Sequence, residues 1–206
     1  MPRIAALLIY PVEGCRAVRV KSCGLSARGL DGDRRWRVNA EDGEALGAEQ
    51  AHTLGRVWVE QKGAELWASA PGADRLLLDP AAVDAAGAWF TRLLSRPVRC
   101  VRLADGQSGG PLLATTTASL AALNQTLARS VTVDLFHPNL VLEGTDPFAE
   151  DRWATVQVGG VRCAVAAHPH TLRPHFGVTL TPALTGAATV QLRAGQGLDV
   201  GLREPP

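Results

Sequence analysis

Three of the chain's five histidines lie within eight residues, at His168, His170 and His175. Pro169 and Pro174 stand among them. Because a proline fixes its own φ and disfavours a helical conformation in the residue before it, we expect a stiff, extended loop here. Imidazole titrates near neutral pH and binds divalent metals in its neutral form. The loop therefore suits metal binding or proton transfer, although three histidines on a surface loop can also lack any such role.

A cluster of hydroxyl side chains, residues 115–117, precedes a second region of interest, a helix predicted to run to about Arg129. The backbone N–H groups at the start of a helix bind anions readily, so these threonines could face a phosphate. Threonine is equally an ordinary N-cap residue. We expect Thr116 or Thr117 to cap this helix, and both are candidate cofactor-binding residues.

The composition argues against nucleic acid and membrane partners. The 206 residues include 21 Lys and Arg against 20 Asp and Glu, which leaves no basic surface for nucleic acid or acidic lipids. No apolar run reaches the roughly 20 residues that cross a bilayer. The apolar opening is too short for a signal peptide, and the four cysteines form no C-x-x-C pair and are expected to be free thiols. We expect a soluble cytoplasmic protein.

The pattern of apolar residues predicts a mainly β protein (α+β) with two principal helices. Many short segments alternate at period two, and hairpins are predicted between residues 57–60 and 65–68 and between residues 155–158 and 161–165. One helix is predicted from Pro80 to Leu94, with Asp79 as its N-cap. Together these elements indicate a closed or nearly closed β structure. All five tryptophans are predicted to lie in the core: Trp36, Trp58, Trp67, Trp89 and Trp153.

Several stretches, taken in order, match the motifs of a known family: residues 9–12, 28–36, 112–124, 136–141, 148–153 and 158–161, with 176–177 and 197–202 as closing strands. The chain thereby resembles the MOSC-domain family, named after the C-terminal domain of molybdenum cofactor sulfurase, and within it the amidoxime-reducing type. The resemblance implies a MOSC-type β-barrel over residues 104–206 and an associated β-rich region over residues 1–103, forming one compact unit without a linker. It also implies a groove for the molybdenum cofactor between the two regions, and molybdenum-dependent oxidoreduction or sulfur transfer as the activity.

The departures from this family's pattern fall at its cofactor site. The family's lysine–serine pair is replaced by Glu13-Gly14, one arginine by His137 and another by Glu49. The cysteine that holds molybdenum in the family is replaced by Thr171. A hydroxyl does not replace a thiolate as a ligand for a thiophilic metal, and lost cations weaken phosphate binding. We therefore expect the standard cofactor to be lost.

Some candidate cofactor contacts survive by resemblance, and they leave anion binding open. They are Arg34, Thr116, Thr117 and Asn139, with Thr171 at the position of the metal ligand.

Three functions are open on this basis. In the first, His137, His168 and His170, supported by Glu13, are the catalytic residues of a small-molecule enzyme whose groove has been repurposed. The three histidines suit a zinc or iron ion and equally suit metal-free acid–base catalysis. In the second, the chain is a non-catalytic ligand-binding or accessory protein. In the third, the family's chemistry is kept and Cys15 holds molybdenum, although a free cysteine is more commonly a small buried apolar residue.

Overall fold

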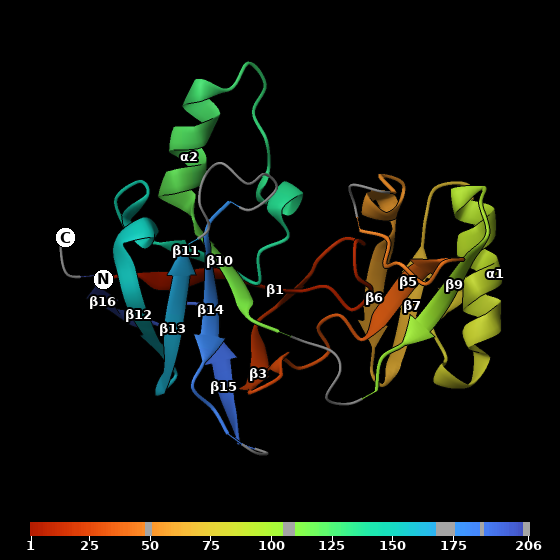
Figure 1. Cartoon of the computed structure of the whole chain (residues 1–206), viewed down its shortest axis with the longest axis horizontal. Helices are drawn as coiled ribbons and strands as arrows, with labels where there is room; N and C mark the ends of the chain where they lie inside the picture. The colour runs from red at the N-terminus through yellow and green to blue at the C-terminus, as the bar shows by residue number, and fades with distance from the viewer. Residues whose placement is uncertain (48–50, 105–109, 168–175, 186–187, 204–206) are drawn as a thin grey trace. The chain divides into compact units, whose positions relative to one another are not determined.

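The computed structural model describes residues 1–47, 51–104, 110–167, 176–185 and 188–203, and in this part the chain is mainly β with two α-helices (Figure 1). This confirms the predicted fold class. The chain divides into two compact units, each made of separate segments. The barrel unit comprises Met1–Leu8, Arg19–Asp31 and Gly110–Pro206, and the insert unit comprises Ile9–Val18 and Gly32–Gly109. The family-based division into residues 1–103 and 104–206 stays a prediction.

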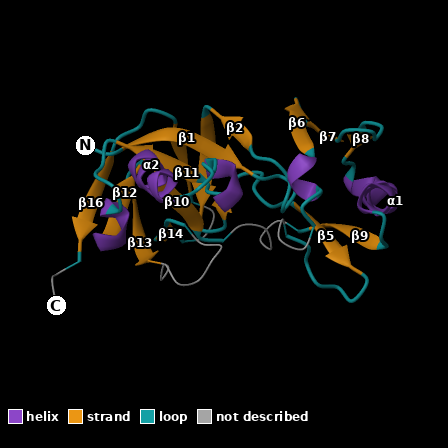
Figure 2. Cartoon of the chain, turned by 90° about the horizontal axis from the view of Figure 1, so that it is seen from above, coloured by secondary structure: helices purple, strands orange, loops and turns teal. Residues whose placement is uncertain are grey.

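The barrel unit is organised around an eight-stranded sheet in the order β16-β12-β13-β14-β10-β11-β1-β2, which curves strongly (Figure 2). Its strands are β1 (Arg3–Ile9), β2 (Val18–Val20), β10 (Leu112–Thr116), β11 (Leu140–Glu143), β12 (Trp153–Val158), β13 (Val161–Ala167), β14 (Val178–Pro182) and β16 (Leu198–Leu202). A smaller sheet has the order β15-β3-β4, with β15 (Thr189–Arg193), β3 (Ser22–Ser26) and β4 (Gly29–Leu30). Strands β10 and β11 pair in parallel, and α2 (Thr117–Thr126) lies between them in the sequence.

The turn between β12 and β13 shows how local sequence sets the register of the barrel. Gly159 and Gly160 have φ values of +59° and +79°. A two-residue hairpin turn needs this left-handed backbone at both central positions, which glycine adopts without steric cost. Val158 then pairs with Val161 across the turn, and the predicted hairpin is confirmed.

The insert unit combines two small sheets with one helix. Strand β5 (Trp36–Ala40) pairs with β9 (Val98–Arg102), and a second sheet has the order β6-β7-β8, with β6 (Trp58–Lys62), β7 (Glu65–Ser69) and β8 (Leu76–Leu77). Helix α1 (Val83–Leu94) follows a 3₁₀ turn, and the Asp79 carboxylate accepts the Ala81 N–H at 2.8 Å, as predicted for the cap. No helix in the described residues is both long and apolar enough to span a bilayer.

The prediction that all five tryptophans lie in the core is wrong for one of them. Three are at most 4% exposed: Trp36, Trp89 and Trp153. Trp67 is half-buried, and Trp58 is 45% exposed. On β6 it is Val59 that points into the core, so the alternate residue Trp58 faces outward, where the Arg16 guanidinium lies 4.8 Å from its ring centre.

Candidate functional site

A buried carboxylate fixes the turn that carries Arg34 in the insert unit. Asp33 is 2% exposed and accepts hydrogen bonds from the Tyr10 backbone N–H at 2.7 Å and from Arg34 Nη1 at 2.5 Å. Arg34 has a left-handed backbone with φ of +48°, its N–H donates to the Tyr10 carbonyl, and its guanidinium lies 5.8 Å from the Tyr10 ring centre. The charge of this candidate cofactor residue is therefore already balanced by Asp33.

Glu13, predicted to support the histidines, is held by an arginine of the same unit. Arg37 Nε donates to Glu13 Oε2 at 2.6 Å, and both side chains are about one third exposed. The Glu13 N–H also donates to the Trp36 carbonyl, which fixes the backbone of this turn against β5. The carboxylate is thus engaged in an ion pair within the insert unit. Glu49, the other acid that replaces a family cation, lies outside the described residues.

Two candidates, His137 and Asn139, lie in the barrel unit before β11. His137 is half-buried and ends the 3₁₀ helix Val133–Phe136 in a left-handed conformation, with φ of +51°. Asn139 is fully buried: its Nδ2 donates to the Leu8 carbonyl at 3.3 Å, and its Oδ1 accepts the Leu113 N–H at 3.2 Å. The Asn139 amide therefore joins two distant segments of the barrel unit, which gives it a role in the fold.

The remaining predicted site residues, His168, His170 and Thr171, lie outside the described residues, as does His175. The predicted histidine cluster therefore stays a prediction. Within the ranges that the structure describes, no three His, Cys, Asp or Glu side chains come together in a way that could hold a metal ion.

The predicted capping of α2 is confirmed, and it involves an acid that sequence reasoning did not single out. Thr116 Oγ1 accepts the Ser119 N–H at 3.0 Å, while Thr117 is exposed. Ser119 Oγ donates to Glu150 Oε2 at 2.9 Å and accepts the Phe148 N–H at 2.7 Å. Thr116 Oγ1 lies 2.6 Å from Ser119 Oγ and 3.4 Å from Glu150 Oε2. This hydroxyl–carboxyl network, Thr116, Ser119 and Glu150, ties the start of α2 to the segment that leads into β12.

Glu150 is the most deeply buried acid of the barrel unit among the described residues, at 1% exposure. Burial raises the pKa of its carboxyl, because the charged form loses its hydration. Hydrogen bonds from Ser119 and Thr116 oppose this effect, the negative charge of Asp151 adds to it, and the pKa stays above its ordinary value. Glu150 therefore takes up a proton more readily than an exposed glutamate.

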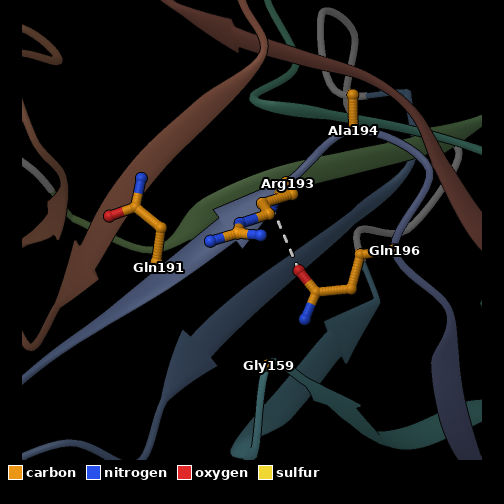
Figure 3. A pocket seen from close by; sticks show the side chains of 5 residues that line it. All are labelled: Gly159, Gln191, Arg193, Ala194 and Gln196. Atoms are coloured by element: carbon orange, nitrogen blue, oxygen red, sulfur yellow. Dashed lines mark hydrogen bonds between the residues drawn. The ribbon is translucent and has the colours of Figure 1, made fainter.

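A surface hollow of about 580 Å³ lies at the end of β15, in the barrel unit. Five residues line it, and Figure 3 shows them: Gly159, Gln191, Arg193, Ala194 and Gln196. Its side chains offer one positive charge and two carboxamides, so its chemistry is that of hydrogen-bond donation to a polar ligand. Sequence patterns did not point to it, because Gly159 in the β12–β13 turn is distant in the chain from residues 191–196, which belong to β15 and the turn after it.

Two family models account for most of the chain. The MOSC N-terminal beta barrel domain matches residues 1–93, and the MOSC domain matches residues 102–170. The chain belongs to the MOSC family. Residues Glu13 and Arg34 thus lie in the part matched by the first model, and the α2 network and His137 in the part matched by the second.

Curated MOSC relatives include amidoxime reducing components and a sulfurase. The human mitochondrial amidoxime reducing component 2 is 28% identical over 205 residues, covering 77% of this chain and 61% of that protein. The human mitochondrial amidoxime-reducing component 1 is 30% identical with the same coverage. The molybdenum cofactor sulfurase of Oryza sativa subsp. japonica is 28% identical over 213 residues, covering 76% of this chain and 26% of that protein. The chain thus spans about three fifths of the length of the amidoxime reducing components.

The cysteines of this MOSC chain do not fit the ligand that a molybdenum cofactor needs. Molybdenum is thiophilic, and the ligand is a thiolate that must reach the metal. All four cysteines are buried, from 0% exposure for Cys15 and Cys163 to 7% for Cys23. Burial raises the pKa of Cys100 to about 12 and that of Cys163 to about 11, and it raises the pKa of Cys15 as well.

Cys15, Cys100 and Cys163 therefore remain protonated inside a core at neutral pH. Cys15 in particular packs in the apolar core of the insert unit, as expected for a structural cysteine rather than a ligand. The Cys23 thiol donates to the Asp31 carbonyl at 3.3 Å. Since no other cysteine exists in the chain, its residues do not fit a cysteine-held molybdenum.

Proposed function

We propose that this MOSC-family chain acts on or binds a small molecule without molybdenum held by a cysteine. The observation that carries the proposal is the burial of all four cysteines, each of which is at most 7% exposed. The pairing of Arg34 with Asp33 supports it, because a cation already matched by a buried carboxylate is less available for a cofactor phosphate. The relatives are named as amidoxime reducing components and a molybdenum cofactor sulfurase, and these names support a small molecule as the ligand or substrate.

The catalytic form of the proposal assigns the chemistry to His137, His168 and His170. Imidazoles can transfer protons at neutral pH, or hold a zinc or iron ion in their neutral form. Glu13 is left out of this centre, since its carboxylate is bound to Arg37. His137 is half-buried and ends a 3₁₀ helix of the barrel unit.

A non-catalytic binding or accessory protein is the second candidate, and the engaged state of the acids favours it. Glu13 is paired with Arg37, and Glu150 is enclosed by hydroxyls. General acid–base catalysis usually needs a titratable group that is free to exchange a proton with the substrate. In the described part of the chain, both of these carboxyls are already bound to other side chains.

Metal analysis of the purified full chain tests the main proposal. We expect molybdenum to be absent at any level near one atom per chain. Molybdenum at one per chain, together with a pterin released on denaturation, would refute the proposal. Zinc or iron near one per chain that is lost in His137→Gln and His170→Gln, but kept in the control His52→Gln, supports the metal-assisted form.

A ligand screen then separates the enzyme from the binding protein. Small molecules that raise the melting temperature of the full chain are incubated with it and analysed by mass spectrometry. Turnover that is lost in His137→Gln and His168→Gln supports catalysis. Binding that leaves the ligand unchanged, with equal affinity in these variants, supports the accessory role and contradicts the catalytic form.

A further inference from the structure

The hollow at the end of β15 has a floor that depends on glycine. Gly159 has φ of +59°, and a Cβ at this position would lie 3.1 Å from Leu192 Cδ2 and Val190 Cγ1 and 3.2 Å from Gln196 Nε2. A side chain here would press against the carboxamide that lines the hollow. The neighbouring Gly160, with φ of +79°, has nothing within 4 Å of its Cβ position. Only the first glycine of the turn keeps the hollow open.

One wall of the hollow presents a donor whose direction is fixed. Gln196 Oε1 accepts the Arg193 N–H at 3.0 Å, as drawn in Figure 3, and the Gln196 N–H donates to the Arg193 carbonyl at 3.2 Å. The Gln196 carbonyl accepts the Ile4 N–H at 2.9 Å, which anchors the turn to β1. With its oxygen committed, the carboxamide turns its Nε2 toward Gly159. Its two N–H groups are therefore available to a ligand.

The Arg193 guanidinium adds a positive charge without an acid beside it. In the described residues it makes no ion pair, and no carboxylate lines the hollow. By comparison, three other arginines are bound to glutamates at 2.5–2.7 Å, in the pairs Arg3–Glu143, Arg37–Glu13 and Arg75–Glu60. Gln191 lies two residues before Arg193 on β15, so its carboxamide comes from the same strand as the guanidinium (Figure 3). A guanidinium flanked by amides matches the geometry of an oxyanion.

We propose that this hollow is a binding site for a small oxyanion, the phosphate or carboxylate group of a ligand. Arg193 supplies the charge, and Gln191 and Gln196 supply further donors. The volume of about 580 Å³ is within the range of small-molecule sites. The site lies entirely in the barrel unit and does not involve the histidines, so it stands apart from the proposed function.

Titration of inorganic phosphate into the ¹⁵N-labelled full chain tests this site, with chloride at matched ionic strength as the reference. We expect saturable shifts of the backbone amides of Gly159, Arg193 and Gln196. In Arg193→Gln the affinity should fall about tenfold or more, because a charge-assisted hydrogen bond is lost. The control Arg162→Gln removes an exposed charge from β13 of the same unit and should change the affinity less than about twofold. Shifts that rise linearly without saturation, or equal losses in both variants, would refute the site.

The paired glycine variants provide a second test that does not change charge. Gly159→Ala and Gly160→Ala strain the same turn, but only the first fills the hollow and displaces the Gln196 carboxamide. Phosphate binding should weaken severalfold in Gly159→Ala and stay unchanged in Gly160→Ala, with melting temperatures showing that both variants fold. Equal affinities would contradict the proposal. Acetate in place of phosphate shows which oxyanion is preferred.

Discussion

Replacing Glu150 by glutamine should change how the stability of the protein depends on pH. Glu150 is 1% exposed, and its carboxyl accepts a hydrogen bond from Ser119 at 2.9 Å. Glutamine keeps an oxygen that can accept this bond but never binds the extra proton. The difference in the free energy of unfolding between the variant and the wild type therefore isolates the proton of Glu150.

The sign of the effect follows from the raised pKa of Glu150. Between the value of about 4.3 for a glutamate in an unfolded chain and the higher value in the folded protein, the folded state binds a proton that the unfolded state has lost. The stability contributed by this group is complete below the unfolded pKa and declines as the pH rises through the folded pKa. The slope reaches at most about 1.4 kcal/mol per pH unit.

Urea unfolding of both proteins at a series of pH values measures this difference. The stability of Glu150→Gln relative to the wild type should increase with pH from about 4.3 upward and level off above the folded pKa of Glu150. The variant Glu41→Gln, which removes a carboxylate from an exposed turn, gives the baseline for the loss of one negative charge. A relative stability that stays level or decreases with pH would show that the buried carboxyl is not proton-linked.

Three further predictions concern residues described above. Thiol titration with a disulfide reagent should find none of the four cysteines reactive in the native protein and all four reactive in urea, since each is buried; rapid reaction of even one native thiol would contradict their assignment to the core. Asn139→Ala should lower the free energy of unfolding by about 2 kcal/mol or more, because it leaves the Leu8 carbonyl and the Leu113 N–H without this side-chain partner. Gln125 is exposed, so the control Gln125→Ala should change the free energy of unfolding by less than about 0.5 kcal/mol. Gly177→Ala should destabilise the chain by about 3 kcal/mol or more, because its Cβ would lie 2.2 Å from the Ala114 carbonyl oxygen. Gly43→Ala, at a similar positive φ but in open space, is the control. Equal urea midpoints for the two variants would refute the close approach of Gly177 to Ala114.

Features set by neighbours in the sequence could be predicted well. Asp79 caps the turn before α1, Thr116 caps α2, and Gly159-Gly160 closes the β12–β13 hairpin. Each depends on residues a few positions apart, whose conformational preferences are strong. The order of the family motifs up to residue 161 was equally informative, since two family models match the regions that carry them.

Features set by distant contacts could not be predicted. Period-two alternation places Trp58 and Val59 on opposite faces of β6 but does not say which face is covered. The ion pair of Glu13 joins residues 24 positions apart, and the bond of Glu150 to Ser119 joins residues 31 positions apart. For Glu150 a usable signal was its place in a family motif, directly after an apolar pair and before Trp153. The hollow at Arg193 gave no signal, because the β12–β13 turn and the end of β15, which are distant in the chain, form it.

The division of the chain has a consequence for its synthesis on the ribosome. Strand β1 is made first, but its partner β11 is more than 130 residues away, and Ile4 pairs with Leu142 only after that strand has emerged. All of the insert unit, which ends at Gly109, is translated in the meantime. Segments that emerge early can fold early. Strands β2 and β4 emerge soon after β1 and β3, but the edge of β1 that pairs with β11 and the edge of β3 that pairs with β15 stay unpaired during most of translation. Nascent chains stalled before residue 140 should therefore expose β1 to chaperones and proteases, while chains released after the last strand should protect it.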